Sequence, residues 1–259
     1  MDKQRSATIT QALMKWREGL ELSRREQSVL GPELQGLDRQ LNRLQQRQLR
    51  VAVFGRVGVG KSSLINALIG DNELATDVAH GSTRRQQAVN WNRPWGEDGR
   101  LQLVDTPGID EIAAPARERL ARRVATGSDL VLMVLDGDIS APELAALKTL
   151  QDSGKPVLLV ANRADTYSRA ERRQLCETIQ HRRGCDEPLL WVAAAPRQPV
   201  VLADGRVRRQ TAPPQLGALQ QHLDQLLGTH GELLLALNSL RAADQFSASL
   251  LAWLSLIHI

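Results

Sequence analysis

The sequence has little cysteine, no long apolar run and no strong excess of either charge. It contains 259 residues and 2 cysteines, Cys176 and Cys185, with no second cysteine pair and no clustered histidines beside them. This argues against a zinc site and fits reduced thiols. No segment has the length of a membrane-spanning helix, and no secretory leader is present. We therefore expect a cytoplasmic protein, and leave peripheral association with a membrane open.

The charge pattern does not indicate a nucleic-acid-binding surface. The formal net charge is +4, and paired arginines such as Arg172-Arg173, Arg182-Arg183 and Arg208-Arg209 are short and scattered. Such pairs are typical of solvated faces rather than of a nucleic-acid stripe. Nucleic acid or the ribosome stays open as a partner without support from these residues. A hydrophobic content of 42% is enough for the core of one large α/β domain with additions.

The stretch VAVFGRVGVGKSSLINAL, residues 51–68, places three glycines between two different patterns. A short β-branched apolar run precedes the glycines, and leucines and isoleucine at helical spacing follow them, which indicates a strand-to-helix junction. Gly55 to Ser62 fits the pattern G-x-x-x-x-G-K-[ST], whose backbone N–H groups cradle phosphates at a helix N-terminus. Lys61 would reach the β- and γ-phosphates, and Ser62 would bind Mg²⁺. The nucleotide-binding residues predicted here are Gly55, Gly58, Val59, Gly60, Lys61, Ser62 and Ser63.

Three further apolar strands end in residues that suit a nucleotide. LQLVDTPG, Leu101–Gly108, ends with Asp105, which suits Mg²⁺ through water, and with the Gly108 N–H, which would face the γ-phosphate. VLLVANRAD, Val157–Asp165, follows. Its final Asp165 can accept hydrogen bonds from guanine N1–H and from the exocyclic amine, an arrangement that adenine does not offer.

Two other residues of this stretch and one later loop complete the predicted base site. Asn162 adds an amide, and Arg163 can lie flat over the base. LLWVAAAP, residues 189–196, is a third strand whose end would place the backbone N–H groups of Ala194 and Ala195 near guanine O6.

With these four motifs in order, the chain resembles the GTPases of the Era, TrmE and septin-like group within the translation-factor class, from Leu49 to Leu227. The resemblance implies a P-loop GTPase domain that depends on Mg²⁺ and binds GTP and GDP. The family's Mg²⁺-binding threonine matches Thr83 best, with Thr76 as the next candidate. The resemblance assigns catalytic roles to Lys61, Thr83 and Gly108, and metal ligation to Ser62, Thr83 and Asp105.

Four departures from the family pattern bear on activity. Arg163 replaces the lysine of Asn-Lys-x-Asp, which changes only the stacking cation. Ala193, Ala194 and Ala195 replace the usual Ser-Ala, so base recognition there rests on the backbone, with the register open by one residue. Gly58 stands where Era- and TrmE-like proteins commonly carry a potassium-binding asparagine, so we expect no potassium activation. Ile109 stands where Ras-like proteins use a glutamine to orient water, which predicts slow intrinsic turnover.

Alternating strands and helices predict an α/β fold with a mostly parallel six-stranded sheet covered by helices on both faces. Helices are expected over Ala141–Leu150, Arg169–Arg182 and Leu216–Leu227. VLADGRVRR and VNWNRPWGEDGRLQL each predict a hairpin. Trp91 and Trp95 in the second hairpin are expected to pack rather than to bind ligand.

Helical patterns flank this domain. Residues 1–48 predict an N-terminal helical region of two helices, one around Leu13, Trp16 and Leu20 and one from Pro32 to Gln48, separated by Gly31-Pro32. The apolar stripe of the second helix would cover either its own chain or a partner helix, such as a second copy in a homodimer. We place the GTPase domain at residues 49–228 and a C-terminal helix at residues 229–253. The expected buried face of that helix is Leu233, Leu237, Leu240, Ala243 and Phe246.

The last six residues, LSLIHI at 254–259, resemble an in-frame translation of a sequencing-library adapter. On this interpretation the C-terminal helix is the start of a truncated helical region, through which similar GTPases often associate with membranes. A natural apolar terminus is the alternative.

Two functions fit these residues. The first is a regulatory switch that hydrolyses GTP to GDP and phosphate with slow intrinsic turnover. The alternative is an assembly-activated scaffold GTPase, similar to dynamins or septins and associated with a membrane.

Overall fold

The structure is a computed structural model that describes residues 2–70, 74, 87–96, 98–110, 114–184, 187–201 and 206–257. The chain divides into two compact units. One comprises Met1–Leu49, Arg93–Leu101 and Leu226–Ile259, and consists mainly of helices. The other comprises Arg50–Asn92 and Gln102–Gln225, and holds the motifs that suggest nucleotide binding.

The second unit is built on a six-stranded sheet with the order β2-β3-β1-β4-β5-β6. The pairs β1–β4, β4–β5 and β5–β6 are parallel, which confirms the mostly parallel α/β sheet. The central strands are apolar along their whole length because both faces are covered, so they show no alternation of polar and apolar residues. The strands are β1 Gln48–Gly55, β2 Gln87–Trp95, β3 Gly99–Asp105, β4 Leu130–Leu135, β5 Val157–Ala161 and β6 Leu189–Trp191.

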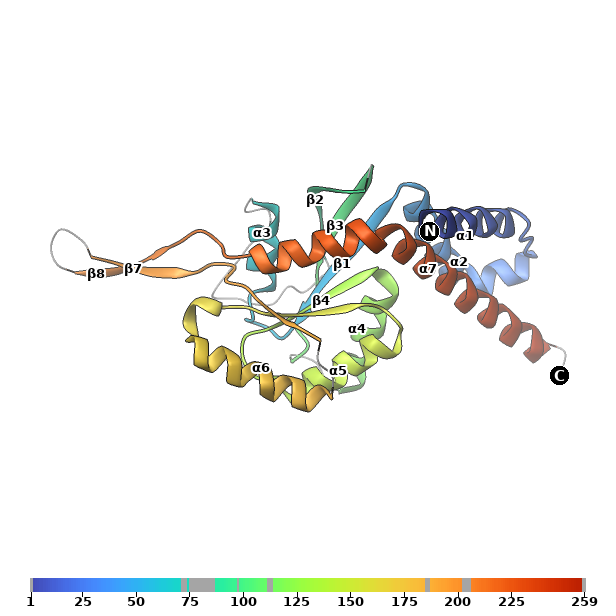
Figure 1. The fold of residues 1–259 in the computed structure, drawn as a ribbon. Coiled ribbons are helices and arrows are strands. Elements are labelled where there is room, and N and C mark those ends of the chain that lie inside the picture. Colours follow the sequence, from blue (N-terminus) through green and yellow to red (C-terminus); the bar gives the residue numbers. More distant parts are fainter. Residues whose placement is uncertain are drawn as a thin grey trace. The chain divides into compact units, whose positions relative to one another are not determined.

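Helices cover both faces of this sheet (Figure 1). On one face, α4 Ala114–Gly127, α5 Ala141–Asp152 and α6 Arg169–Arg183 pack on alternate residues of β1, β4 and β5 in one apolar cluster. On the other lie α3 Lys61–Ile69 and the first residues of α7. The sequence pattern predicts α3, α5 and α6 but not α4.

Both predicted hairpins are present. β2 and β3 are neighbours joined by three residues, a connection that only an antiparallel pair allows. Trp91 and Trp95 are 5% and 4% exposed and donate their indole N–H groups to the carbonyls of Leu68 and Arg100, so both are packing residues as expected. The second hairpin forms a separate two-stranded sheet from β7 Arg197–Val201 and β8 Val207–Thr211.

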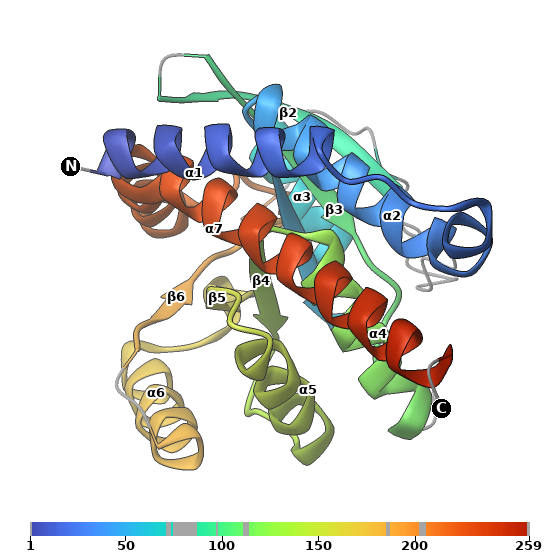
Figure 2. The same ribbon diagram turned by 90° about the vertical axis from the view of Figure 1, so that its right-hand side faces the viewer.

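The helical unit contains α1 Asp2–Glu18, α2 Arg24–Gln45 and most of α7 (Figure 2). The expected break at Gly31-Pro32 is wrong, because Pro32 lies inside α2. A capping box of Ser23 and Glu26 starts this helix earlier than the sequence analysis placed it. An interior proline costs a helix about 3 kcal/mol. One continuous buried face holds the helix together on both sides of Pro32, and it consists of Leu30, Leu37, Gln40, Leu41 and Leu44.

The C-terminal helix also differs from expectation. The two helices predicted around a break after residue 228 are one helix, α7 Gly217–Ile257, which runs through both Gly228 and Gly231. A Cβ at position 231 would lie 2.6 Å from the Trp95 ring, so this glycine permits close packing of helix and tryptophan. Packing on Trp95 thus explains why a residue that usually ends helices is found inside one.

The buried face of α7 is shifted from the predicted one. Leu235, Asn238 and Ser239 are buried, whereas Leu240 is 44% exposed. The inward Ser239 hydroxyl has a partner on another helix, because Gln40 Nε2 of α2 donates to Ser239 Oγ at 3.2 Å. Ala243 and Phe246 are buried as expected, and N-terminal helices do provide the cover.

Across the described ranges, no helix combines the length and the apolar composition that crossing a bilayer requires.

Candidate functional site

The predicted phosphate loop lies at the C-terminal end of β1 and opens α3. Gly58 and Gly60 have φ angles of 79° and 90°, which only glycine adopts readily. The Leu64 N–H donates to the Gly60 carbonyl, so the helix begins directly after the glycines. Gly55 is required for a different reason, because a Cβ there would lie 2.4 Å from the Val134 carbonyl oxygen of β4.

Lys61 turns back over this loop. It is 7% exposed, and its Nζ donates to the carbonyls of Gly55 at 3.1 Å and Arg56 at 2.7 Å. The ammonium is thereby held at the hollow of the loop, where a phosphate chain would carry its negative charge.

Ser62 and Asp105 meet across the site. Ser62 Oγ, in the first turn of α3, donates to Asp105 Oδ2 at 2.6 Å. The end of β3 is fixed beside the loop because Thr106 Oγ1 donates to the Val53 carbonyl of β1 at 2.8 Å. A hydroxyl and a carboxylate oxygen are both ligands that Mg²⁺ accepts, so this pair fits the predicted metal position.

Gly108 touches the phosphate loop directly. A Cβ on Gly108 would lie 2.1 Å from Val57 Cγ2 and 2.8 Å from the Val57 backbone nitrogen. The Val57 N–H donates to Asp110 Oδ1 at 2.7 Å, a contact that the sequence analysis missed. The segment after β3 and the phosphate loop are therefore in close contact at two points.

Asn162 connects the phosphate loop with the last predicted loop. It is 4% exposed, its Nδ2 donates to the Val59 carbonyl at 2.9 Å, and its Oδ1 accepts from the Ala194 N–H at 3.1 Å. A Cβ on Gly60 would lie 2.4 Å from Asn162 Nδ2. The Ala194 N–H is thus bonded to Asn162, and the next residue, Ala195, is exposed.

Arg163 and Asp165 follow on an exposed turn. Arg163 has a φ of 60°, and its guanidinium donates to the Gly58 carbonyl at 2.5 Å and to Asp136 Oδ2 at 3.3 Å. Asp165 is exposed, and its Oδ2 accepts from the Arg197 N–H at 3.3 Å. The structure therefore gathers the predicted phosphate and base residues around one edge of the sheet.

A charged network beneath the loop escaped the sequence analysis. Arg56 donates to Asp136 Oδ1 and to Glu143 Oε1, both at 2.8 Å. Burial alone would lower the pKa of Arg56, but Glu143, Asp136 and Asp110 outweigh it and raise that pKa. The available signals were Asp136 at the end of an apolar strand and the spacing Ser140-x-x-Glu143, which is a capping box.

The segments beside the phosphate loop hold two further residues that the sequence connects with hydrolysis. Ile109, in the position of the water-orienting glutamine, is fully buried in the apolar cluster with Phe54 and Ala121. Thr83, predicted as catalytic and as a metal ligand, and Thr76 lie outside the described residues.

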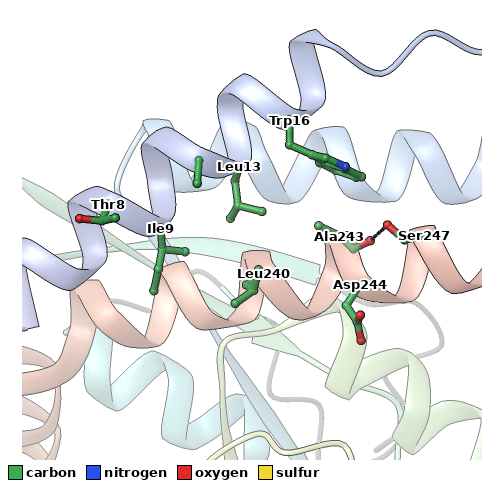
Figure 3. A pocket seen from close by; sticks show the side chains of 9 residues that line it. Thr8, Ile9, Leu13, Trp16, Leu240, Ala243, Asp244 and Ser247 are labelled. Carbon is green, nitrogen blue, oxygen red and sulfur yellow. Dashed lines mark hydrogen bonds between the residues drawn. The ribbon is translucent and has the colours of Figure 1, made fainter.

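A second hollow lies in the helical unit and is chemically different (Figure 3). It has a volume of about 420 Å³ between α1 and α7. Ile9, Leu13 and Trp16 point toward α7 there, and Asp244 is its charged residue. An apolar hollow with a carboxylate does not suit a nucleotide phosphate, so the site at the sheet edge is the candidate nucleotide site.

The glycine loop on a strand–helix junction, the lysine inside it and the Asn-x-x-Asp turn define a P-loop GTPase domain of the translation-factor class. Residues 50–163 match the family model described as "50S ribosome-binding GTPase".

Curated relatives agree on the class. The chain is 41% identical over 124 residues to GTPase Der of Salinispora tropica, covering 46% of this chain and 26% of the relative. It is 38% identical over 120 residues to GTPase Era of Stenotrophomonas maltophilia, covering 44% of this chain and 39% of the relative. It is 34% identical over 160 residues to tRNA modification GTPase MnmE of Synechococcus elongatus, covering 58% of this chain and 32% of the relative. The chain thus spans well under half the length of each.

Among solved structures, the chain is similar to Era in complex with MgGDPNP and nucleotides 1506–1542 of 16S ribosomal RNA. The likeness covers 57% of this chain and 51% of that one, with 24% identity and a TM-score of 0.49.

Proposed function

We propose that the chain binds GTP and GDP specifically and hydrolyses GTP slowly as a regulatory switch, with residues 49–228 as its GTPase domain. The observation that carries this proposal is the Asn162 side chain, which bonds the phosphate loop at Val59 and the base loop at Ala194. One buried amide thereby positions the residues for phosphate and for guanine relative to each other, which is what binding of a whole nucleotide requires.

The residues of the base loops support guanine rather than adenine. Asp165 would accept from guanine N1–H and the exocyclic amine, and Arg163 would cover the ring. Because the Ala194 N–H is bonded to Asn162, Ala195 is the residue whose N–H would meet guanine O6. We therefore propose Ala195 rather than Ala194 as the residue that contacts guanine O6.

Ser62 and Asp105 would hold Mg²⁺, Ser62 directly and Asp105 through water, together with Thr83. Two close protein oxygens leave most of the six positions of Mg²⁺ to phosphate oxygens and water, as is usual for this ion. When bound, the ion neutralises charge that develops on the β- and γ-phosphates. Lys61 would stabilise the same charge, and the Gly108 N–H would face the γ-phosphate.

Slow turnover follows from Ile109. Its side chain is fully buried in the apolar cluster, so it neither reaches nor orients water. By analogy with unassisted GTPases, we expect turnover on the order of 10⁻⁴ to 10⁻² s⁻¹. The scaffold alternative gains no support from the relatives, which are Der, Era and MnmE proteins. A cytoplasmic location belongs to the proposal, since a sequence with only 2 cysteines and no second cysteine pair fits reduced thiols.

Calorimetric titration of the full chain with GDP and with ADP tests the proposal. We expect a micromolar or tighter Kd for GDP and binding of ADP weaker by more than about 100-fold, since two hydrogen bonds from the base are lost. Lys61→Ala should abolish GTP hydrolysis. ADP binding within about tenfold of GDP binding would show that guanine specificity has been assigned wrongly.

A further inference from the structure

The hairpin β7–β8 stands apart from the rest of its unit. It forms its own two-stranded sheet, and its two legs are also bonded to each other at the base, where the Ala212 N–H donates to the Pro196 carbonyl at 2.8 Å (Figure 1). All residues of Arg197–Val200 and Arg206–Thr211 are exposed, including Val207 at 65%. An isolated hairpin without a covered face is only marginally stable in water. Both faces of this arm are therefore accessible to a binding partner.

The arm is strongly basic. It carries four arginines, and the acidic residue in the same stretch of sequence, Asp204, lies outside the described residues. The pairing of Pro199 with Arg209 and of Val200 with Arg208 places these two arginines on opposite faces. In the described part of the chain, Arg208 and Arg209 make no ion pair. The sequence alone predicts a solvated face for this pair. The arginines of β7 and β8 become part of one surface only when the two strands pair.

The residue types in the arm indicate which kind of partner it can bind. Its described residues include no aromatic residue, leucine or methionine, so this part of the arm offers none of the large anchors that dominate protein–protein interfaces. Its cations are all arginines, whose forked donors match phosphate oxygens. A-form RNA has a wide, shallow minor groove at which proteins contact phosphates and 2′-hydroxyls, and a narrow two-stranded ribbon with arginines on both faces suits such contacts.

We infer that the β7–β8 arm binds the phosphodiester backbone of RNA, with arginines on both faces contacting phosphates. This site lies outside residues 50–163, which match the family model, and does not depend on the proposed nucleotide chemistry.

The base of the arm also touches the predicted guanine site. The Arg197 N–H, at the start of β7, donates to Asp165 Oδ2, and the two backbone hydrogen bonds between Ala193 and Gln215 close the same region. RNA bound to the arm would therefore act on the Arg197–Asp165 hydrogen bond and, through it, on the position of the Asp165 carboxylate. By reciprocity, GDP would change the affinity for RNA by the same factor by which RNA changes the affinity for GDP. This second step rests on the proposed function, whereas binding of RNA by the arm does not.

The test measures binding of fluorescently labelled RNA to the full chain without nucleotide. The probes are a duplex of about 16 base pairs and a single strand of similar length, titrated between about 50 and 200 mM salt. Arg208→Ala/Arg209→Ala should weaken binding about tenfold and reduce the slope of log K against log salt by about 1 to 2. Arg208→Lys/Arg209→Lys keeps the charge but loses the forked donors, so it should keep the salt slope of the unchanged chain and bind with an affinity between those of the unchanged chain and the alanine variant.

The matched control is Arg169→Ala/Arg173→Ala, which removes the same charge from exposed positions on α6. It should change RNA affinity less than twofold, and all three variants should bind GDP like the unchanged chain. Equal loss in both alanine variants would overturn the inference, as would absence of RNA binding. Binding to phosphatidylserine vesicles in place of RNA would overturn it too. Identical RNA affinity with and without saturating GDP would overturn the coupling step alone.

Discussion

Arg56 of the phosphate loop donates from Nε to Oε1 of Glu143 at 2.8 Å, although Glu143 is completely buried at the start of α5. The other oxygen of Glu143 accepts from the Ser140 N–H at 2.8 Å and from Ser140 Oγ at 2.6 Å. A buried carboxylate with these partners fixes the loop to a helix N-terminus. The second residue of the phosphate loop therefore has a structural role that the motif itself does not describe.

Replacing Glu143 by glutamine should test this role. The change keeps the shape but removes the charge that faces Arg56, and we expect it to lower the free energy of unfolding by about 2 kcal/mol in urea denaturation. Glu118→Gln on α4 is the control, because the Glu118–Arg122 pair is exposed and contributes about 0.5 kcal/mol or less. An equal effect of the two changes would contradict a special contribution from the buried pair.

Ile109→Gln should not restore rapid hydrolysis. The side chain at this position lies in the apolar cluster, so a glutamine would bury an amide and lower the free energy of unfolding by about 2 to 3 kcal/mol. Ile109→Val, which only shortens the side chain, should cost about 1 kcal/mol. Single-turnover GTP hydrolysis and urea denaturation measure both effects. A gain in rate of about tenfold or more for Ile109→Gln would show that the side chain can reach water.

Gly108→Ala should separate the phosphate loop from the segment that follows β3. The added Cβ would overlap Val57, so we expect the Kd for GTP to rise about tenfold or more and the free energy of unfolding to fall by about 1 to 3 kcal/mol. Gly127→Ala is the matched control, because nothing lies within 4 Å of its added Cβ. If Gly108→Ala bound GTP as tightly as the control, the contact with Val57 would be unimportant.

The two glycines inside α7 should respond in opposite directions to the same change. Gly231→Ala would place a Cβ against the Trp95 ring and should destabilise the chain by about 1 to 3 kcal/mol. Gly228→Ala has open space and should stabilise it by about 0.5 to 1 kcal/mol, since alanine favours the helix. Urea denaturation of the two variants decides. If both substitutions stabilised the chain, the Trp95 ring would have to move aside at little cost in free energy.

Asp165→Asn should move the preference of the site from guanine to xanthine. An amide in this position offers a donor and an acceptor, which match the xanthine edge, whereas the carboxylate accepts twice from guanine. We expect the Kd for GDP to rise about 100-fold and xanthosine diphosphate to bind in its place. Calorimetric titration with both nucleotides measures the change, and unaltered GDP affinity would remove Asp165 from the base site.

Local chemistry explains which parts of this molecule could be predicted from sequence. The phosphate loop was predictable because its glycines, lysine and helix start occupy one short segment, Gly55–Ser62. The partners of Arg56 were not, because Asp136 and Glu143 are separated from it by 80 and 87 residues. Only the fold brings the three side chains together.

The errors in the helical unit have a similar origin. Pro32 signals a helix end by its own chemistry, yet packing of α2 on one continuous face outweighs that signal. The face of α7 was misassigned because hydrophobicity alone selects Leu240. In the folded chain, Ser239 faces inward because Gln40 satisfies its hydroxyl.

The bonding of Asn162 also has a genetic consequence. Its amide is held by a main-chain carbonyl at Val59 and a main-chain N–H at Ala194, and most missense changes leave such groups in place. At position 194 only proline removes the donor. Random mutagenesis selected for loss of nucleotide binding should therefore recover many different codons at position 162, but mainly proline and bulky residues at position 194.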